Sequence, residues 1–268
     1  MIKIKADHLT GTQETLLIPL YIRALETKHP DPIIQDPLAC EIVDHLEYDF
    51  LKLRIPEITA ISTAMRVRQF DRWVKEFLVA HPNSIVVNIG CGLCTRFQRI
   101  DNGKVEWYDL DFPEVIELRK KLIAEEDRYH YIAQSVMDTD WIENLSKAKN
   151  SNMLFIAEGV LMYIHLEDVK KFVIRLQESF PGAELILDMC NRFIAKNSSR
   201  QPALKGIDTS IKWGVKGSLD IERWNKGIRL LEDWFYFNQK EKRLGCYNLF
   251  RYVPFISNFF RILHYKLG

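Results

Sequence analysis

The sequence predicts an α/β fold in which helices cover both faces of a mainly parallel sheet. From about residue 60 onward, short apolar runs alternate with segments in which apolar residues recur every three or four positions. This alternation is typical of a doubly wound parallel sheet. Most residues of these runs are apolar, as expected of strands that are buried on both faces. One of them, IVVNI at residues 85–89, leads into a glycine-rich turn, which predicts a ligand site at that strand end.

Six strands and three helices are predicted in chain order. The strands are residues 85–89, 105–110, 129–136, 153–157, 184–189 and a closing segment, 259–267. Apolar stripes predict helices over residues 67–78 and 166–176, the second of which is stopped by Pro181 and Gly182. A further helix is predicted over residues 15–26, before the proline-rich segment HPDPIIQDPLA.

The order of these elements divides the chain into four segments. Residues 61–193 form the α/β core, and residues 233–268 supply its closing strands. Residues 1–60 form an N-terminal helical cap segment, and residues 194–232, which have a helical pattern, form a second cap insertion. We expect both caps to cover the carboxyl ends of the strands, where ligands bind in open α/β folds.

Composition excludes several classes of partner. Among the 268 residues, 37 Lys and Arg balance 36 Asp and Glu, so the net charge of +1 favours neither nucleic acid nor an anionic membrane. No apolar run reaches the roughly 18 residues of a membrane span, and the N-terminus lacks the layout of a signal peptide. Five cysteines suggest reduced thiols. We therefore expect a cytoplasmic protein that acts on a small molecule.

The turn after residue 89 has the layout of a nucleoside pocket. Gly90 and Gly92 allow the backbone to turn sharply and approach a ligand. Asp111 ends the next strand about 20 residues later, where a carboxylate can accept hydrogen bonds from both ribose hydroxyls. The third glycine of a dinucleotide fingerprint is replaced by Thr95, which counts against a nicotinamide-dependent oxidoreductase.

Three further acids could complete this pocket. Asp138 and Asp140 follow the third strand, and one of them could accept the exocyclic amine of an adenine while the other caps the next helix. We assign Asp138 to the adenine. Glu158 ends the fourth strand and is expected to face the same crevice. A ribose acid, an adenine acid and a third acid together suit S-adenosyl-L-methionine.

Four motifs in order carry a resemblance to a known family. AMRVRQFDRWV, VNIGCGLCTRFQRI, WYDLDFPEVIELRKKLI and AEGVLMYI resemble the leucine carboxyl methyltransferase family, and its bacterial polyketide-type O-methyltransferases more than its eukaryotic members. The resemblance implies a class I methyltransferase fold, with a seven-stranded sheet and a helical cap, and S-adenosyl-L-methionine as methyl donor.

The resemblance also implies roles for single residues. Arg66 matches the arginine that grips the methionine carboxylate, and Gly90 and Gly92 match the turn beneath the methionine. Asp111 matches the ribose acid, Asp138 falls near the adenine position and Glu158 matches the acid of the EGVLMY motif. One departure is Cys94, which stands where the family has an aspartate.

Each of these residues has a plainer interpretation. Arg66 could be a solvated helix residue, but we expect it near the start of its helix, with Ser62 or Thr63 as N-cap. A cation is disfavoured there unless a carboxylate binds it. Cys91 and Cys94 form a C-x-x-C pair without a second pair, so we interpret them as inert thiols and expect no metal site. His165 is the one histidine that the sequence places near the crevice; we interpret it as a surface residue at a helix start, with a general base as the alternative, and we assign no catalytic residue.

The sequence leaves the methyl acceptor open. A carboxylate is already ionised at neutral pH, whereas a phenol of pKa about 10 benefits from a base. The absence of an obvious base favours a carboxylate on a small, polyketide-like molecule over a hydroxyl. The alternatives are a protein C-terminal carboxylate and a nucleotide-binding scaffold without activity.

Overall fold

A seven-stranded sheet forms the centre of the protein. The computed structural model describes residues 3–5, 15–146, 152–198 and 210–268. The strands lie in the order β5-β4-β3-β6-β7-β9-β8, with β3 to β7 parallel and β9 antiparallel to both of its neighbours. Their bounds are β3 Ile85–Ile89, β4 Glu106–Asp111, β5 Tyr129–Ala133, β6 Met153–Ala157, β7 Ala183–Cys190, β8 Ile228–Phe235 and β9 Phe260–Leu267.

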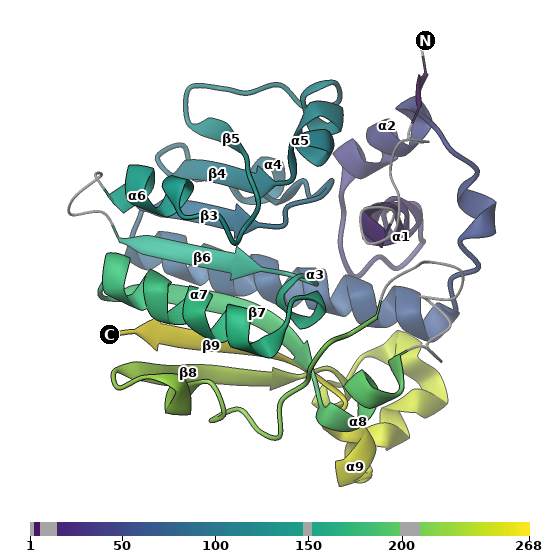
Figure 1. The fold of residues 1–268 in the computed structure, drawn as a ribbon. Coiled ribbons are helices and arrows are strands. Elements are labelled where there is room, and N and C mark those ends of the chain that lie inside the picture. Colours follow the sequence, from purple (N-terminus) through teal and green to yellow (C-terminus); the bar gives the residue numbers. More distant parts are fainter. Residues whose placement is uncertain (1–2, 6–14, 147–151, 199–209) are drawn as a thin grey trace.

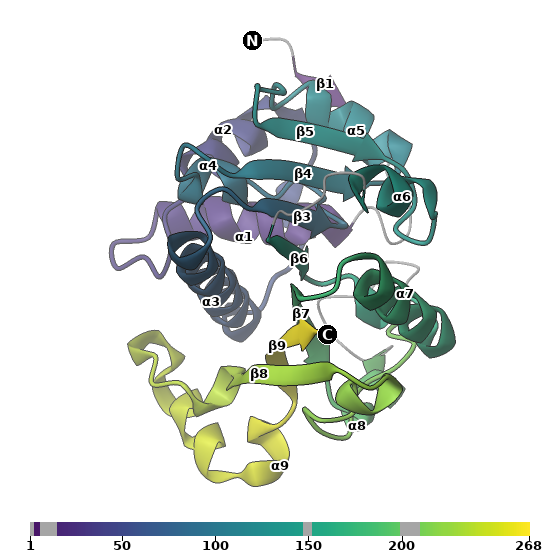
Figure 2. The same ribbon diagram turned by 90° about the vertical axis from the view of Figure 1, so that its left-hand side faces the viewer.

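Helices cover both faces of this sheet (Figures 1 and 2). On one face lie α3 (Glu57–Ala80), α4 (Arg96–Ile100) and α5 (Pro113–Lys120), and on the other α6 (Asp140–Ser146) and α7 (Leu166–Ser179). The N-terminal helices α1 (Leu17–Thr27) and α2 (Pro37–His45) pack with the first group. A two-stranded sheet, β1 (Ile4–Lys5) with β2 (Leu46–Glu47), adjoins them.

The remaining elements are short. α8 (Arg192–Lys196) and α9 (Pro254–Ser257) are each about one turn long. The 3₁₀ helices are η2 (Phe50–Lys52), η3 (Leu161–Tyr163), η6 (Glu222–Trp224), η7 (Tyr236–Asn238) and η8 (Lys242–Tyr252). None of the helices in the described part of the chain is long and apolar enough to cross a membrane.

The order of the strands places a crevice between β3 and β6. These strands are neighbours, with Ile89 opposite Ala157 at their carboxyl ends. From β3 the chain continues outward to β4 and β5, and it then returns to β6 and proceeds to β7 on the other side. Ligands bind at such a reversal because the loops diverge there. The glycine turn follows β3 and Glu158 follows β6, so both lie at this crevice.

The predicted α/β class, with a mainly parallel seven-stranded sheet and a helical cap, is confirmed. All six predicted strands are present, with ends that differ by three residues or fewer. The strand predicted over 129–136 ends at Ala133, because Asp138 closes a turn by accepting a hydrogen bond from Ser135 N at 3.0 Å. The helix predicted over 15–26 is α1.

The helical interpretation of residues 194–232 is wrong where that segment enters strand β8. Residues 228–232 belong to this strand, which pairs antiparallel with β9, and only α8 and η6 are helical elsewhere in the described part. A register shift between Leu230 and Glu232 interrupts the two-residue alternation that identifies a strand. Residues 199–209 lie outside the described residues. The division of the chain into core and cap segments stays a prediction.

Candidate functional site

The turn after β3 has a conformation that requires glycine. Gly90 and Gly92 have φ values of 60° and 48°, in the left-handed region that other residues rarely adopt. A Cβ on Gly90 would also lie 2.4 Å from Val160 Cγ2. A side chain at Gly90 is therefore excluded for two reasons: the backbone conformation would be strained, and the Cβ atom would collide with Val160.

Asp111, at the end of β4, is bonded to this turn. Its carboxylate accepts hydrogen bonds from Gly92 N at 2.7 Å and from Phe112 N at 2.8 Å. Burial raises the pKa of the Asp111 carboxyl above its usual value, against the lowering effect of these two N–H groups. Because a carboxylate offers about four acceptor positions, two remain for hydroxyls of a ligand.

Arg119, which the sequence analysis missed, supports the turn from α5. Its guanidinium donates to the carbonyl oxygens of Gly92, at 2.8 Å, and Cys94, and forms an ion pair with Asp109 at 2.5 Å. The side chain is 1% exposed, although arginine on a helix is normally solvated. No local pattern in the sequence predicts that the Arg119 side chain points into the protein.

Glu158, on the opposite side of the crevice, is held between two arginines. Arg66 Nε lies 2.8 Å from Glu158 Oε1, and Arg96 Nη2 lies 2.5 Å from Oε2. Burial raises the pKa of the Glu158 carboxyl, but the two guanidinium groups outweigh burial and lower it to about 2. Glu158 is therefore a fixed negative charge and a poor proton acceptor.

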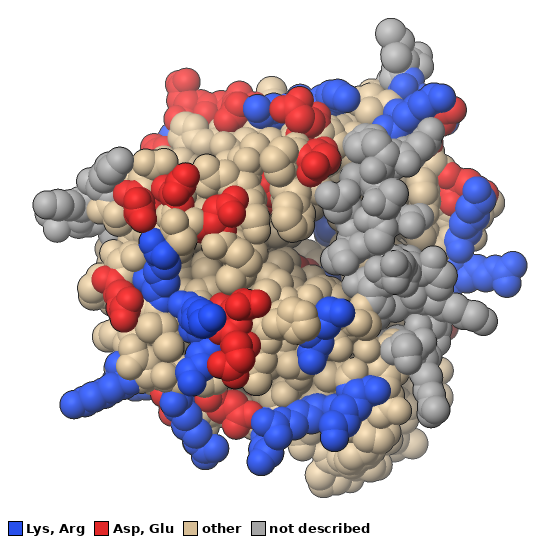
Figure 3. Space-filling model, viewed as in Figure 1, with Lys and Arg blue, Asp and Glu red and all other residues tan. Residues whose placement is uncertain are grey.

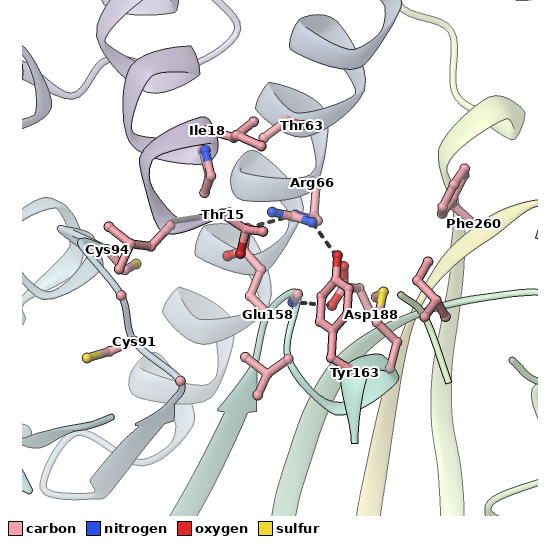
Figure 4. Close-up of a pocket in the computed structure, with 18 of the residues that line it drawn as sticks. Thr15, Ile18, Thr63, Arg66, Cys91, Cys94, Glu158, Tyr163, Asp188 and Phe260 are labelled. Carbon is pink, nitrogen blue, oxygen red and sulfur yellow. Dashed lines mark hydrogen bonds and ion pairs between the residues drawn. The ribbon is translucent and has the colours of Figure 1, made fainter. Parts of the chain in front are cut away.

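Asp188, at the end of β7, is a further acid that the sequence analysis missed. It accepts a hydrogen bond from Gly159 N at 2.6 Å and one from Arg66 Nη1 at 3.1 Å (Figure 4). Burial raises the pKa of Asp188, although Arg66 lowers it. Arg66 thus forms ion pairs with two acids, Glu158 and Asp188, which lie 92 and 122 positions away in the chain.

These contacts belong to a longer string of ion pairs whose charges alternate. Arg96 and Arg99 share Asp71, at 2.6 and 2.9 Å, and Arg99 continues to Asp36 at 2.8 Å. Asp36 also pairs with Arg23 at 2.8 Å and caps α2 by accepting from Ala39 N. The string, from the cap to the sheet, consists of Arg23, Asp36, Arg99, Asp71, Arg96, Glu158, Arg66 and Asp188.

A cavity of about 720 Å³ lies over these residues, within the range of small-molecule sites. Figure 4 shows Arg66 and Glu158 near its middle, between the cysteines of the glycine turn and Phe260. We call the part lined by Gly90, Gly92, Asp111, Phe112, Gln134 and Val136 the glycine half. The part lined by Tyr163, Tyr236, Phe237, Phe250, Phe259 and Phe260 is the aromatic half.

The glycine half contains an acceptor without a partner. Gln134 Oε1 is buried and has no hydrogen-bond partner within the described structure, and Gln134 lines the cavity next to Asp111. Such an atom is costly to leave unbonded, so an N–H group of a ligand would stabilise it. This observation, with Asp111, fits an adenosine group. Gln134 was not predicted from the sequence, because the strand was expected to continue to residue 136 and instead ends at Ala133.

The structure does not bring all of the predicted residues into the cavity. Arg66, Gly90, Gly92, Asp111 and Glu158 line it. Asp138 is exposed on the turn after β5, does not line the cavity and bonds to Ser135 N instead. Its role at an adenine stays a prediction, as do the roles of the five that do line the cavity.

The expected helix start near Arg66 is wrong. Helix α3 begins at Glu57, so Arg66 lies in its third turn, where the macrodipole argument does not apply. Ser62 does not cap the helix; its hydroxyl donates to the Ile58 carbonyl oxygen one turn back, at 2.6 Å. The carboxylates that accompany Arg66 are Glu158 and Asp188.

The other candidate groups lie as follows. His165 is exposed at the start of α7 and does not line the cavity. Cys91 is buried, and burial raises the pKa of its thiol well above the usual value. Cys94 lines the cavity, and its sulfur lies 3.6 Å from Arg96 Nη1. Among the residues described, no group of His, Cys, Asp and Glu side chains is arranged to hold a metal ion.

Solved structures share this fold. A putative methyltransferase from Thermobifida fusca superposes with a TM-score of 0.61 at 15% identity, covering 98% of this chain and 97% of that one. The N-methyltransferase NodS from Bradyrhizobium japonicum in complex with S-adenosyl-L-homocysteine gives a TM-score of 0.51 at 10% identity, covering 96% and 99%. At these identities the likeness shows the fold alone.

Sequence comparisons show the family. The model of the leucine carboxyl methyltransferase family matches residues 17–176. The tetracenomycin polyketide synthesis O-methyltransferase TcmP of Streptomyces glaucescens is 32% identical over 84% of this chain and 83% of its own. The S-adenosyl-L-methionine-dependent methyltransferase dpfgK of Gibberella zeae is 24% identical over 89% and 87%. The chain therefore belongs to the leucine carboxyl methyltransferase family and is an S-adenosyl-L-methionine-dependent O-methyltransferase.

Proposed function

We propose that this O-methyltransferase esterifies the carboxylate of a flat aromatic small molecule. The observation that carries the proposal is the aromatic half of the cavity, which six Tyr and Phe side chains line. Aromatic walls favour aromatic ligands through stacked and edge contacts. The role of the Streptomyces relative in polyketide synthesis supports an acceptor of this type, since the two chains share most of their length.

The lining residues favour a carboxylate over a hydroxyl. No histidine or lysine is among the described residues that line the cavity. The low pKa of Glu158, about 2, makes this carboxylate a weak base. A phenol with a pKa of about 10 would have to lose its proton before or during attack, whereas a carboxylate is already ionised at neutral pH.

The proposed reaction needs positioning more than proton transfer. S-adenosyl-L-methionine, when bound, supplies a methyl group on positively charged sulfur; attack by the acceptor oxygen forms the O–C bond, and the C–S electron pair stays on sulfur. Asp111 would accept from the ribose hydroxyls, and Gln134 Oε1 from the adenine amine. The N–H groups of Arg66 that Glu158 and Asp188 leave free would donate to the methionine carboxylate. Holding the two reactants in line supplies much of the acceleration.

Product chemistry tests this proposal. The protein would be incubated with methyl-labelled S-adenosyl-L-methionine and either naphthalene-2-carboxylate or 2-naphthol, which present the two kinds of oxygen on the same ring system. We expect label in the carboxylate product, released as methanol by mild base because it is a methyl ester. A base-stable aryl ether from the naphthol, with no ester from the acid, would overturn the carboxylate assignment.

A protein acceptor is tested in the same assay. A short peptide with a free C-terminal carboxylate replaces the aromatic acid, and an amidated copy of the peptide is the matched control. Because four of the six side chains that define the aromatic half are phenylalanines, which offer a peptide backbone no hydrogen bonds, we expect no labelled ester from either peptide. Base-labile label in the free-acid peptide alone would favour a protein substrate.

A further inference from the structure

The wall of the aromatic half continues to the outer surface of the protein. In α8, Ile194 lines the cavity, whereas its neighbour Phe193 is 49% exposed. In α9, Ile256 lines the cavity, and its neighbour Phe255 is 55% exposed. Two one-turn helices therefore form a wall that is apolar on its inner and outer sides.

Ring contacts connect the two sides of this wall. Phe259 lines the cavity, and its ring centroid lies 5.2 Å from that of Phe255 and 6.0 Å from that of Phe193. The rings of Phe193 and Phe255 are themselves 5.0 Å apart. Phe259 thus lines the cavity and also packs against two aromatic rings that are exposed at the surface.

Exposed apolar side chains concentrate at this place. Among the described residues, six of the thirteen large apolar side chains that are exposed lie in α8 or between residues 247 and 255. The surface over α9 is tan in Figure 3, without charged side chains in that view. We call these six the outer rim: Phe193, Tyr247, Leu249, Tyr252, Val253 and Phe255. Of these six, Phe193 and Phe255 contact each other, and exposed apolar groups in contact often mark a binding surface.

We propose that the outer rim binds an apolar chain carried by the methyl acceptor. The acceptor would then be an aromatic acid with an alkyl or acyl substituent, whose ring occupies the aromatic half and whose chain passes Phe259 onto Phe193 and Phe255. This inference rests on the proposed function, because it places the ring in the aromatic half. The continuity of ring contacts from cavity to surface supports this occupant.

A second copy of the protein is a less suitable occupant of the outer rim. A stable protein–protein interface uses about 20–30 residues from each partner, and the outer rim offers six side chains. A lipid surface is the other possible occupant. Sedimentation with phosphatidylcholine vesicles tests it, and rim-dependent binding to these vesicles without any preference for a chain-bearing acid would overturn the proposal.

The experiment compares two probes on the same protein. Dissociation constants of naphthalene-2-carboxylate and 6-octylnaphthalene-2-carboxylate are measured by calorimetry with S-adenosyl-L-homocysteine at saturation. Burial of even a few methylene groups predicts at least about tenfold tighter binding of the octyl probe. We call the ratio of the two dissociation constants the octyl preference. It measures the contribution of the octyl group to binding, because the ring and the carboxylate are common to both probes.

Two double variants test where on the protein the octyl group binds. Phe193→Ser with Phe255→Ser removes the centre of the outer rim, and we expect it to reduce the octyl preference several-fold. The matched control, Leu51→Ser with Leu219→Ser, removes two exposed leucines elsewhere and should leave the octyl preference unchanged. Because all four side chains are exposed, we expect both variants to fold.

The outcomes separate this inference from the proposed function. An octyl preference that falls only in the rim variant supports the outer rim, even if neither probe is methylated. Methylation of the unsubstituted acid without an octyl preference would leave the proposed function standing and overturn the rim. An octyl preference that both double variants retain, or no binding of the octyl probe up to its solubility limit, would also overturn it.

Discussion

Replacement of Asp111 by asparagine is the sharpest test of the donor site. The carboxylate accepts from Gly92 N and Phe112 N and has two acceptor positions left. Asparagine keeps the shape but replaces one oxygen by an N–H donor, which cannot accept from a ribose hydroxyl. Losing one hydrogen bond to a charged acceptor costs about 1.5–3 kcal/mol. We therefore expect S-adenosyl-L-homocysteine to bind roughly 10- to 10²-fold more weakly to Asp111→Asn.

The assay is calorimetric titration with S-adenosyl-L-homocysteine, with urea unfolding of each variant alongside. Glu114→Gln is the matched control, since it also removes one carboxylate near the start of α5 but is exposed and does not line the cavity. A loss of less than tenfold in a folded Asp111→Asn protein would refute the ribose assignment. A similar loss in Glu114→Gln would show that the affinity depends on the negative charge at this end of the sheet and not on hydrogen bonds from Asp111 to the ribose.

Four further predictions follow from other contacts. Glu158→Gln leaves two buried guanidinium groups underneutralised and should lower the free energy of unfolding by about 3–5 kcal/mol in urea. In the unaltered protein, the stabilisation due to Glu158 is present above its ordinary pKa of 4.5 and should be lost as the pH falls toward about 2, which unfolding across that range measures. Gly90→Ala should cost about 2 kcal/mol or more, from positive φ and the contact with Val160. Gln134→Leu should weaken S-adenosyl-L-homocysteine roughly two- to tenfold but leave S-inosyl-L-homocysteine, which lacks the amine, unchanged.

Features encoded in one short stretch of sequence could be predicted. The buried strands were recognisable because β3, β6 and β7 consist mostly of apolar residues, as expected of strands covered on both faces. Gly92 and Asp111 were found together because a glycine turn and the end of the neighbouring strand have a fixed spacing in this architecture. The hydrogen bond between them is the direct consequence.

Features that depend on distant contacts could not be predicted. Arg96 and Arg119 have ordinary helical positions, and only the tertiary structure shows that they point at Glu158 and at the glycine turn. Helix α3 was expected to start at a Ser or Thr cap, but Pro56 precedes it and no side-chain hydrogen bond caps it. Strand β8 was missed because a bulge interrupts its alternation.

The alternating string of charges has a consequence for how this protein can change over time. Each member in the middle of the string pairs with two others, so the loss of one member removes one ion pair from each of its two neighbours. Substitutions that survive should therefore come in compensating pairs. Position 36 should vary together with positions 23 and 99, and position 71 with positions 96 and 99. Across related proteins these arginines and acids should be inherited as one unit, even where the acceptor changes and the aromatic half diverges.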